Sequence, residues 1–164
     1  MKRLWQEDEL VDQWTLQADE LAVIHEKNYP PHNRLGLAVQ LKYFQHEGQF
    51  PEHKRDIPKA IVEFIGKQLG IAAREFRKYR WRGRTMERHH DRIRLLLGLR
   101  KASIEDARVL RTWLITTVLP RQQQDEALKA ALIDQCRSMQ ITPPTQGRLD
   151  RHGGDFHRLV PVFW

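Results

Sequence analysis

Between Arg74 and Arg84 the sequence reads REFRKYRWRGR, in which basic side chains alternate with aromatic ones. The planar guanidinium group of arginine donates paired hydrogen bonds that match the oxygens of a phosphate. The basic residues continue beyond this run, so that residues 74–101 hold eleven Lys and Arg against three Asp and Glu. We therefore interpret the arginine run as a candidate surface for a polyanion, with an ordinary solvated charged face as the alternative.

The side chains that we expect to contact a nucleic acid are the bases of this run and of the helical stretches beside it. Lysine and arginine bind phosphate oxygens, and arginine also pairs with the major-groove edge of guanine. The predicted DNA-binding residues are Arg34, Arg74, Arg77, Lys78, Arg80, Arg82, Arg84, Arg88 and Arg92. Which of them read bases and which hold phosphates stays open at this point.

The composition of the chain agrees with a polyanionic partner but does not identify it. The 164 residues carry a formal net charge of +7, and the acids gather in residues 1–30, with seven Asp and Glu against three Lys and Arg. DNA, RNA and an anionic membrane surface all fit such a charge. No apolar stretch is long enough to span a membrane, no signal peptide is evident, and Cys136 is the only cysteine. We therefore expect a cytoplasmic protein without a membrane partner.

The arginine run follows a spacing that is typical of a helix-turn-helix. Such a motif needs a small residue where its helices cross and a glycine in the turn, because the turn residue takes a positive φ. With Gly70 in the turn, Gly66 falls at the crossing position. The apolar residues that would lock the helices together are Ile65, Leu69, Ile71, Phe76 and Tyr79. The second helix, at residues 72–79, would then enter the major groove of DNA.

Other interpretations of this region stay open. The segment could be an ordinary helical hairpin whose charged face is only solvated. A second hairpin could turn at Gly98, but its crossing position is then Arg94, which is too large for a tight contact. Trp81 could stack on the bases of a single strand, whereas Trp14 and Trp113 lie on apolar helix faces and are expected in the core.

The remaining residues that could carry chemistry indicate structural roles. His89 and His90 are adjacent, so on a helix they point about 100° apart and cannot share a metal ion. Cys136 follows Ile133 in a helical pattern, which favours a buried thiol over a nucleophile. No paired carboxylates and no glycine-rich phosphate loop stand out. We expect no cofactor, no metal and no catalytic residue.

The segments that carry these side chains are all predicted to be helical. Apolar residues recur at spacings of three and four, and glycines and prolines mark the ends of the segments. The predicted helices cover residues 7–14, 18–26, 34–46, 57–69, 72–79, 85–97, 103–119 and 125–139. Ser103 and Asp106 resemble a capping box. We predict an all-α fold with two subdomains, residues 1–82, with the helix-turn-helix at about 61–80, and residues 83–150, a second DNA-binding subdomain.

Several blocks of residues carry a further signal. The first is NRLGLAVQLKYF at residues 33–44, followed by Gly48 and by Phe50-Pro51. The later blocks are PKAIV at 58–62, QLGI at 68–71, YRWRGRT at 79–85, His89, IR at 93–94, LGLR at 97–100, WL at 113–114, VLP at 118–120, PPT at 143–145 and GR at 147–148. In this order they resemble the N-terminal region of the large transposases of the Tn-three family, over about residues 7–150.

The resemblance implies a partner and a limit to the function. In that family this region is helical, contains more than one DNA-binding unit and binds the terminal inverted repeats of the transposon. Strand cleavage belongs to a separate RNase H-like domain. The resemblance therefore implies sequence-specific binding of double-stranded DNA at terminal inverted repeats, without strand-cleavage chemistry and without an enzymatic activity of the chain itself.

The last residues depart from the family pattern. Where the family continues with another basic helical segment, residues 151–164 read RHGGDFHRLVPVFW. We interpret this divergent tail as the sign of a truncated transposase. The alternative function is then that of an interaction or inhibitory module, whose partner is the full-length transposase or a second copy of this chain.

Overall fold

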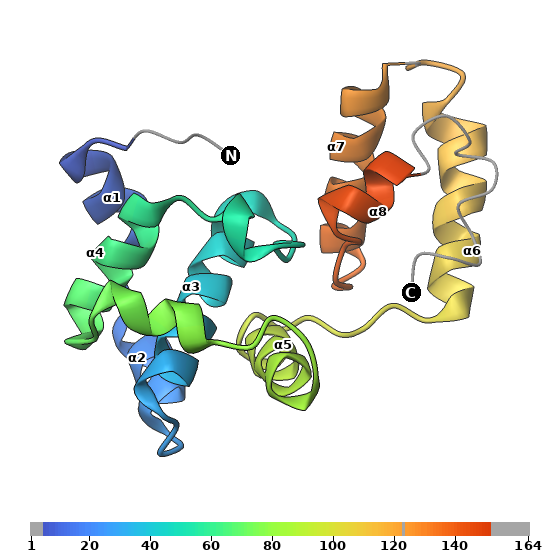
Figure 1. The fold of residues 1–164 in the computed structure, drawn as a ribbon. Coiled ribbons are helices and arrows are strands. Elements are labelled where there is room, and N and C mark those ends of the chain that lie inside the picture. The colour runs from blue at the N-terminus through green and yellow to red at the C-terminus, as the bar shows by residue number, and fades with distance from the viewer. Residues whose placement is uncertain (1–4, 123, 152–164) are drawn as a thin grey trace. The chain divides into compact units, whose positions relative to one another are not determined.

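The described part of the chain is helical, as the sequence predicts. The computed structural model describes residues 5–122 and 124–151, and these contain no strand, only an isolated parallel bridge between Arg100 and Ile141. The α-helices, shown in Figure 1, are α1 (Glu7–Trp14), α2 (Ala18–His25), α3 (Pro31–Glu47), α4 (Lys59–Leu69), α5 (Arg84–Leu96), α6 (Ile104–Trp113), α7 (Asp125–Ser138) and α8 (Gln146–Arg151). Short helices of other types are η1 (Lys54–Asp56), η2 (Ala73–Lys78) and η3 (Leu114–Val118). The predicted all-α class is confirmed.

The chain divides into two compact units, and the division falls between Leu96 and Leu97. The sequence suggested a boundary near Gly83, which would separate α5 from the helices before it. In the structure α5 contacts α2 and α3. The first unit therefore contains both the arginine run and the basic helix that follows it. Most of the divergent tail, residues 152–164, lies outside the described residues.

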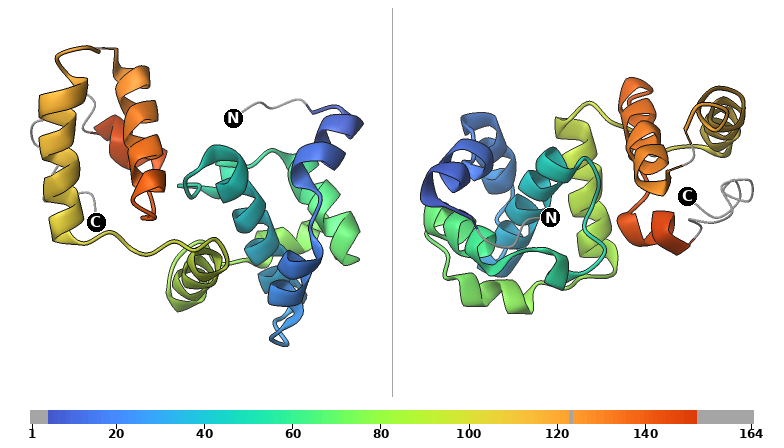
Figure 2. Two further views of the ribbon diagram at one scale, coloured as in Figure 1. Left: turned by 180° about the vertical axis from the view of Figure 1, so that it is seen from behind. Right: turned by 90° about the horizontal axis from the view of Figure 1, so that it is seen from above.

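α3 is the centre of the first unit. All its residues from Leu35 to Phe44 are buried, and a helix that is buried all round must be covered by neighbours on every side. The neighbours are α2, α4, α5 and η2, as the views in Figure 2 show. The buried ammonium group of Lys42 lies 3.4 Å from the carboxylate of Glu20 on α2, so this charge is paired inside the unit.

α3 begins before the residues that the periodicity predicts. The sequence placed this helix at residues 34–46, because Pro30 and Pro31 read as part of a loop. In the structure Pro31 is the first helical residue. Proline is tolerated there, because the first N–H groups of a helix have no partner within it and the fixed φ of proline suits the first turn.

The second unit is a small helical bundle with its own core. α6 runs into η3, a π-helical turn in which the Leu119 N–H donates to the Leu114 carbonyl at 2.9 Å. The core of the unit consists of Leu110, Leu114, Leu128, Leu132, Cys136, Ile141 and Leu149. Burial above all raises the pKa of the Cys136 thiol to about 12. Cys136 therefore stays protonated at neutral pH and packs as a small apolar side chain.

The capping box expected at the start of α6 is present and is extended by an arginine. The Ser103 hydroxyl accepts the Asp106 N–H at 3.1 Å, and the Asp106 carboxylate accepts the Ser103 N–H at 2.7 Å. The Arg100 guanidinium group donates to both carboxylate oxygens, at 2.6 and 2.8 Å. Arg100 first, with Ser103, holds the pKa of Asp106 well below its ordinary value. These contacts fix the first residues of the second unit.

Candidate nucleic-acid interface

The arginine run begins on a hairpin formed by α4 and η2. Gly70 follows α4 with a φ of 63°, the positive value that the turn requires. At the crossing point the Ile71 N–H donates to the Gly66 carbonyl at 2.8 Å. A Cβ atom on Gly66 would stand 2.6 Å from the backbone oxygen of Ile71, so only glycine fits there. The small residue and the turn glycine thus occupy the positions that the spacing predicts.

The second element of the hairpin corrects the prediction of an α-helix at residues 72–79. η2 is a six-residue 3-10 helix, and at its end the Tyr79 N–H donates to the Phe76 carbonyl three residues earlier, at 3.2 Å. Both side chains are buried. With three residues per turn, residues three apart lie on one face, so this geometry brings both rings inward together. A helix-turn-helix with an α-helical second element is not confirmed.

Three residues per turn also sort the exposed side chains of η2 into rows. Arg74 and Arg77 form one exposed row. The half-buried Glu75 and the exposed Lys78 form another row, in which the Lys78 ammonium group donates to both carboxylate oxygens of Glu75, at 2.8 and 3.0 Å. On an α-helix Arg74, Arg77 and Lys78 would share a face. In the structure Lys78 is turned away from the two arginines and has an acidic partner.

Tyr79 anchors the arginine run to the centre of the first unit. Its ring lies against Gly36 of α3, where an added Cβ atom would stand 2.3 Å from the ring. The Gln40 amide donates to the Tyr79 hydroxyl oxygen at 2.6 Å, and this oxygen lies 2.9 Å from Nδ1 of His89. Since the hydroxyl accepts from Gln40, its own proton is donated to His89. One side chain thereby joins η2, α3 and α5.

His89 is a neutral packing residue in this arrangement. Burial first, and the nearby Arg92 second, lower the pKa of His89 to about 4. The imidazole ring stacks on the Tyr79 ring with a centroid distance of 5.5 Å. Its buried Nε2 has no hydrogen-bond partner among the described residues. His89 therefore holds the aromatic core together and carries no charge to a ligand at neutral pH.

Trp81 is a second anchor of the arginine run. Its indole N–H donates to the Glu52 carbonyl at 2.8 Å. The ring stands edge-on to Phe76 and Tyr79, with centroid distances of 6.0 and 5.8 Å. Trp81, which the sequence left open as a residue that stacks on bases, therefore packs against Phe76 and Tyr79 of the same unit.

The segment around η1 lies beside the arginine run, which sequence reasoning missed. The Lys54 ammonium group donates to the Arg77 carbonyl at 2.9 Å and stands 5.7 Å from the centre of the Phe76 ring. Arg55, the next residue, is exposed and makes no hydrogen bond or ion pair with a described residue. No local pattern could have indicated this neighbour, because the contact joins residues that are 23 positions apart.

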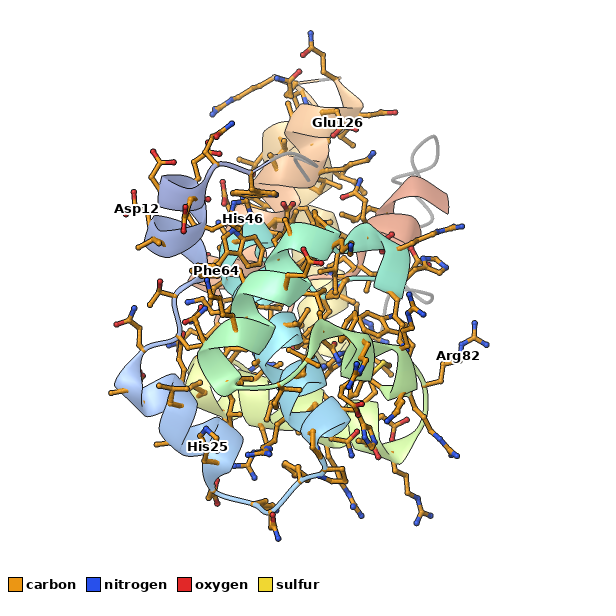
Figure 3. All side chains as sticks on the ribbon, turned by 60° about the vertical axis from the view of Figure 1, so that its left-hand side comes forward. Asp12, His25, His46, Phe64, Arg82 and Glu126 are labelled. Carbon is orange, nitrogen blue, oxygen red and sulfur yellow. The ribbon has the colours of Figure 1, made fainter. Side chains whose placement is uncertain are left out.

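Six of the nine predicted DNA-binding residues form an exposed set that we call the arginine strip. The arginine strip consists of Arg74, Arg77, Arg80, Arg82, Arg84 and Arg88. None of these guanidinium groups makes a hydrogen bond or an ion pair with any residue in the described part of the chain. Figure 3 shows Arg82 extending away from the ribbon. The buried rings between them fix the backbone, while the charged groups stay open to a ligand.

The other predicted arginines are held within the first unit. Arg92 is only partly exposed, pairs with the Glu26 carboxylate and donates to the Val23 carbonyl at 2.9 Å. The Arg34 guanidinium group lies 3.5 Å from Nδ1 of His25. Together with Lys78, these residues have protein partners that a phosphate would have to displace.

No tight helical hairpin turns at Gly98. α5 ends at Leu96, and the chain then runs without a helix to the start of α6. Arg94, the residue at the supposed crossing position, pairs with Asp91 at 2.8 Å and lies over the Phe50 ring at 5.4 Å. The second hairpin that the sequence left open is therefore absent from the described chain.

The arrangement is suited to binding a polyanion. It offers exposed guanidinium donors on a backbone that the buried rings of Phe76 and Tyr79 hold in place, and these donors match phosphate oxygens in charge and geometry. Within residues 5–122 and 124–151, no group of three His, Cys, Asp or Glu side chains could hold a metal ion. No helix of that part is long and apolar enough to cross a membrane.

Comparison with known proteins identifies relatives of the chain. A family model described as "Domain of unknown function (DUF4158)" matches residues 1–154. The chain is 30% identical over 89 residues, 51% of its length, to "Transposase for transposon Tn1546" of Enterococcus faecium. It is 27% identical over 104 residues, 63% of its length, to "Transposase for transposon Tn501" of Pseudomonas aeruginosa. It is 24% identical over 144 residues, 88% of its length, to "Transposase for transposon Tn3926" of Escherichia coli.

The relatives are much longer than this chain. The alignments cover 9%, 10% and 14% of the three transposases, respectively. All three carry the name of a transposase, which confirms the resemblance that the ordered sequence blocks indicate. The matched region is therefore a small part of each of these larger proteins.

Proposed function

The chain belongs to the DUF4158 family, and we propose that it is the DNA-binding module of a transposase. In this proposal it binds double-stranded DNA, with sequence specificity, at the terminal inverted repeats of a transposon. The relatives named as transposases support the biological context. No catalytic residue is proposed, and strand cleavage is left to other parts of a transposase.

The arginine strip is the observation that carries the proposal. Its six guanidinium groups make no hydrogen bond or ion pair with the described residues, although acids pair with Arg92, Arg94 and Lys78 in the same unit. Unpaired cations bind phosphates without first breaking an ion pair inside the protein, and the anchored backbone does not have to be ordered on binding. Each neutralised phosphate also releases counterions from the DNA, which adds favourable entropy at low salt.

A binding titration at several salt concentrations tests the proposal. Fluorescence anisotropy would compare a duplex that carries a terminal repeat of the element encoding this chain with a scrambled duplex of equal composition. We expect tighter binding to the repeat. The plot of log affinity against log salt should have a slope of about −5 if all six strip residues neutralise a phosphate, at about −0.9 per contact.

A pair of charge-matched double variants tests the position of the interface. Arg80→Gln with Arg82→Gln removes two strip charges, and we expect roughly a tenfold or greater loss of affinity at moderate salt. Lys27→Gln with Lys59→Gln removes two exposed charges outside the strip and should change affinity little. Equal losses in both variants would show that binding follows net charge alone and would remove the strip from the proposal.

The remaining outcomes concern the partner. Equal affinity for repeat and scrambled duplexes at every salt concentration would remove the claim of specificity. If the chain binds single-stranded DNA or an RNA duplex of the same length more tightly, that nucleic acid replaces double-stranded DNA as the proposed ligand. Absence of binding to all these probes would overturn the proposed function as a whole.

A further inference from the structure

We propose that the arginine strip grips the phosphate backbone of the duplex and does not read bases, and that Arg55 belongs to the same phosphate-binding surface. This inference rests on the proposed function, because it specifies how the proposed DNA contact is made. It replaces the expectation that residues 72–79 enter the major groove as a recognition helix.

The shape of η2 argues against base readout. A recognition helix projects from the protein into a major groove about 12 Å wide. η2 has six residues, which gives a length of about 12 Å at 2.0 Å per residue. Both α3 and α4 contact it, and Phe76 and Tyr79 press it against the core. An element held along its whole length in this way offers DNA only its outer side chains.

The chemistry of the exposed side chains also favours phosphate. Base edges in the major groove present both donors and acceptors, and adenine is read mainly by Asn or Gln. The exposed residues from position 72 to position 84 are Ala72, Arg74, Arg77, Lys78, Arg80, Arg82, Gly83 and Arg84. Their polar groups are donors only, and the oxygens of a phosphate are acceptors only. A set made only of donors can bind phosphates along the whole run, whereas among the bases its arginines could pair bidentately only with guanine.

The geometry of the exposed row fits the same partner. Arg74 and Arg77 lie one 3-10 turn apart, which is about 6 Å along the helix axis. This interval is comparable to the separation of successive phosphates along one strand. Lys78 is one residue further on but stands in another row and is paired with Glu75. The 3-10 geometry thus predicts that Arg77 contributes more to phosphate binding than its neighbour Lys78.

Arg55 is added to the surface by two long-range hydrogen bonds. The Lys54 side chain is tied to the Arg77 carbonyl, and the Glu52 carbonyl accepts the Trp81 N–H. These bonds hold the segment around η1 beside the strip. Since the Lys54 ammonium group is used inside the protein, Arg55 is the cation of that segment left exposed without a described partner.

Four single variants test the inference on the full chain. Arg77→Ala and Arg55→Ala should each lower the affinity for repeat and scrambled duplexes by the same factor, roughly fivefold, and reduce the salt slope by about 0.9. Lys78→Ala should change both affinities by less than about twofold, because its charge is already paired. Lys59→Ala, an exposed cation that pairs with Glu63 at 3.2 Å, is the control for Arg55.

A conservative variant separates the two modes of contact. Arg77→Lys keeps the charge but loses the planar fork. If Arg77 contacts a phosphate, this variant should retain the salt slope and most of the affinity. If Arg77 instead makes a bidentate contact to guanine, the variant should lose affinity for the repeat and keep its affinity for the scrambled duplex. This result would overturn the inference. If Arg77→Ala and Lys78→Ala lower the affinity equally, the argument from the two rows of η2 is wrong.

The inference and the proposed function fail in different ways. If the wild-type chain binds none of the duplexes, the proposed function fails and the inference falls with it. If it binds and Arg77→Ala relaxes the preference for the repeat, only the inference fails. If Arg55→Ala leaves the affinity and the salt slope unchanged, Arg55 is not part of the phosphate-binding surface. Urea unfolding of each variant checks that these exposed substitutions leave the fold intact.

Discussion

At the scale of single residues, Tyr79 decides where the arginine strip lies. Its ring fills the space beside Gly36, and its hydroxyl is shared between Gln40 and His89. These partners come from α3 and α5, so the hydroxyl connects elements far apart in the chain. Two strip residues, Arg77 and Arg80, lie within two positions of Tyr79. A change at Tyr79 is therefore expected to affect the fold and the strip together.

The Tyr79→Phe variant measures how much this hydroxyl contributes to the free energy of unfolding. Its removal leaves the buried Gln40 amide and His89 ring without their partner, which should lower the free energy of unfolding by about 1–3 kcal/mol. Urea unfolding gives this quantity. The control is Tyr43→Phe, in the same unit, because the Tyr43 hydroxyl makes no hydrogen bond with a described residue. Equal losses in both variants would contradict the role of the shared hydroxyl.

The buried His89 predicts a loss of stability in acid. Its folded-state pKa of about 4 lies below the ordinary value of 6.5. Between these values the unfolded chain binds a proton that the folded chain does not, so the free energy of unfolding falls as the pH drops from about 6.5 to about 4. His89→Gln should reduce this fall, by up to about 3 kcal/mol.

Urea unfolding at about pH 7 and about pH 4.5 would measure this difference. The control is His25→Gln at the exposed His25, which Figure 3 shows on the outside of the first unit. A wild-type chain that unfolds with the same pH dependence as His89→Gln would contradict the assignment of His89 as buried and neutral.

At the scale of elements, the α4–η2 hairpin combines a tight crossing with an unusual second helix. The crossing needs Gly66, because the Ile71 carbonyl occupies the space of a Cβ atom. The turn needs a residue that accepts a positive φ, which is Gly70. The two glycines thus serve different purposes, one for space and the other for backbone conformation. Substitutions should distinguish these purposes.

Gly66→Ala should destabilise the chain although alanine favours helices. The clash with a backbone oxygen cannot be relieved by a side-chain rotation, and we expect a loss of about 1–3 kcal/mol in the free energy of unfolding. Gly70→Asn should cost less than about 1 kcal/mol, because asparagine tolerates a positive φ and no atom stands within 4 Å of the added Cβ. A gain in stability for Gly66→Ala, as helix propensity alone predicts, would contradict the close crossing.

At the scale of the whole molecule, the chain consists of two units that each have a core. The first is built around α3 and includes α5, and the second is built around α6 and α7. The strip lies entirely in the first unit, from Arg74 to Arg88. The first unit should therefore fold and bind DNA without the second.

Two fragments test this division. Residues 1–96 should unfold cooperatively in urea and retain most of the salt slope of the full chain. Residues 1–82 end at the boundary that the sequence suggested and lack α5, so that Tyr79 loses its His89 partner. We expect this shorter fragment to unfold without a cooperative transition. Cooperative unfolding of residues 1–82 with an unchanged near-UV circular dichroism spectrum would show that α5 is not part of the first unit.

Features that depend on local chemistry could be predicted from the amino-acid sequence. Helical periodicity, the glycines at 66 and 70, the capping box at Ser103 and the buried thiol of Cys136 each follow from residues within a few positions of one another. The structural inferences hold because side-chain size, charge and φ preference act over short stretches of chain. The types of the strip residues likewise favour a phosphate ligand, which stays a prediction.

Features that depend on partners distant in the chain became known from the folded structure. Contacts of η2 with α3 and α4 accompany a 3-10 helix where periodicity favoured an α-helix. Contacts with α2 and α3 placed α5 in the first unit, and Lys54 brought Arg55 beside the strip. Glu26, which lies 66 residues earlier in the chain, pairs with Arg92. Such contacts join residues far apart in the chain, and no local pattern encodes them.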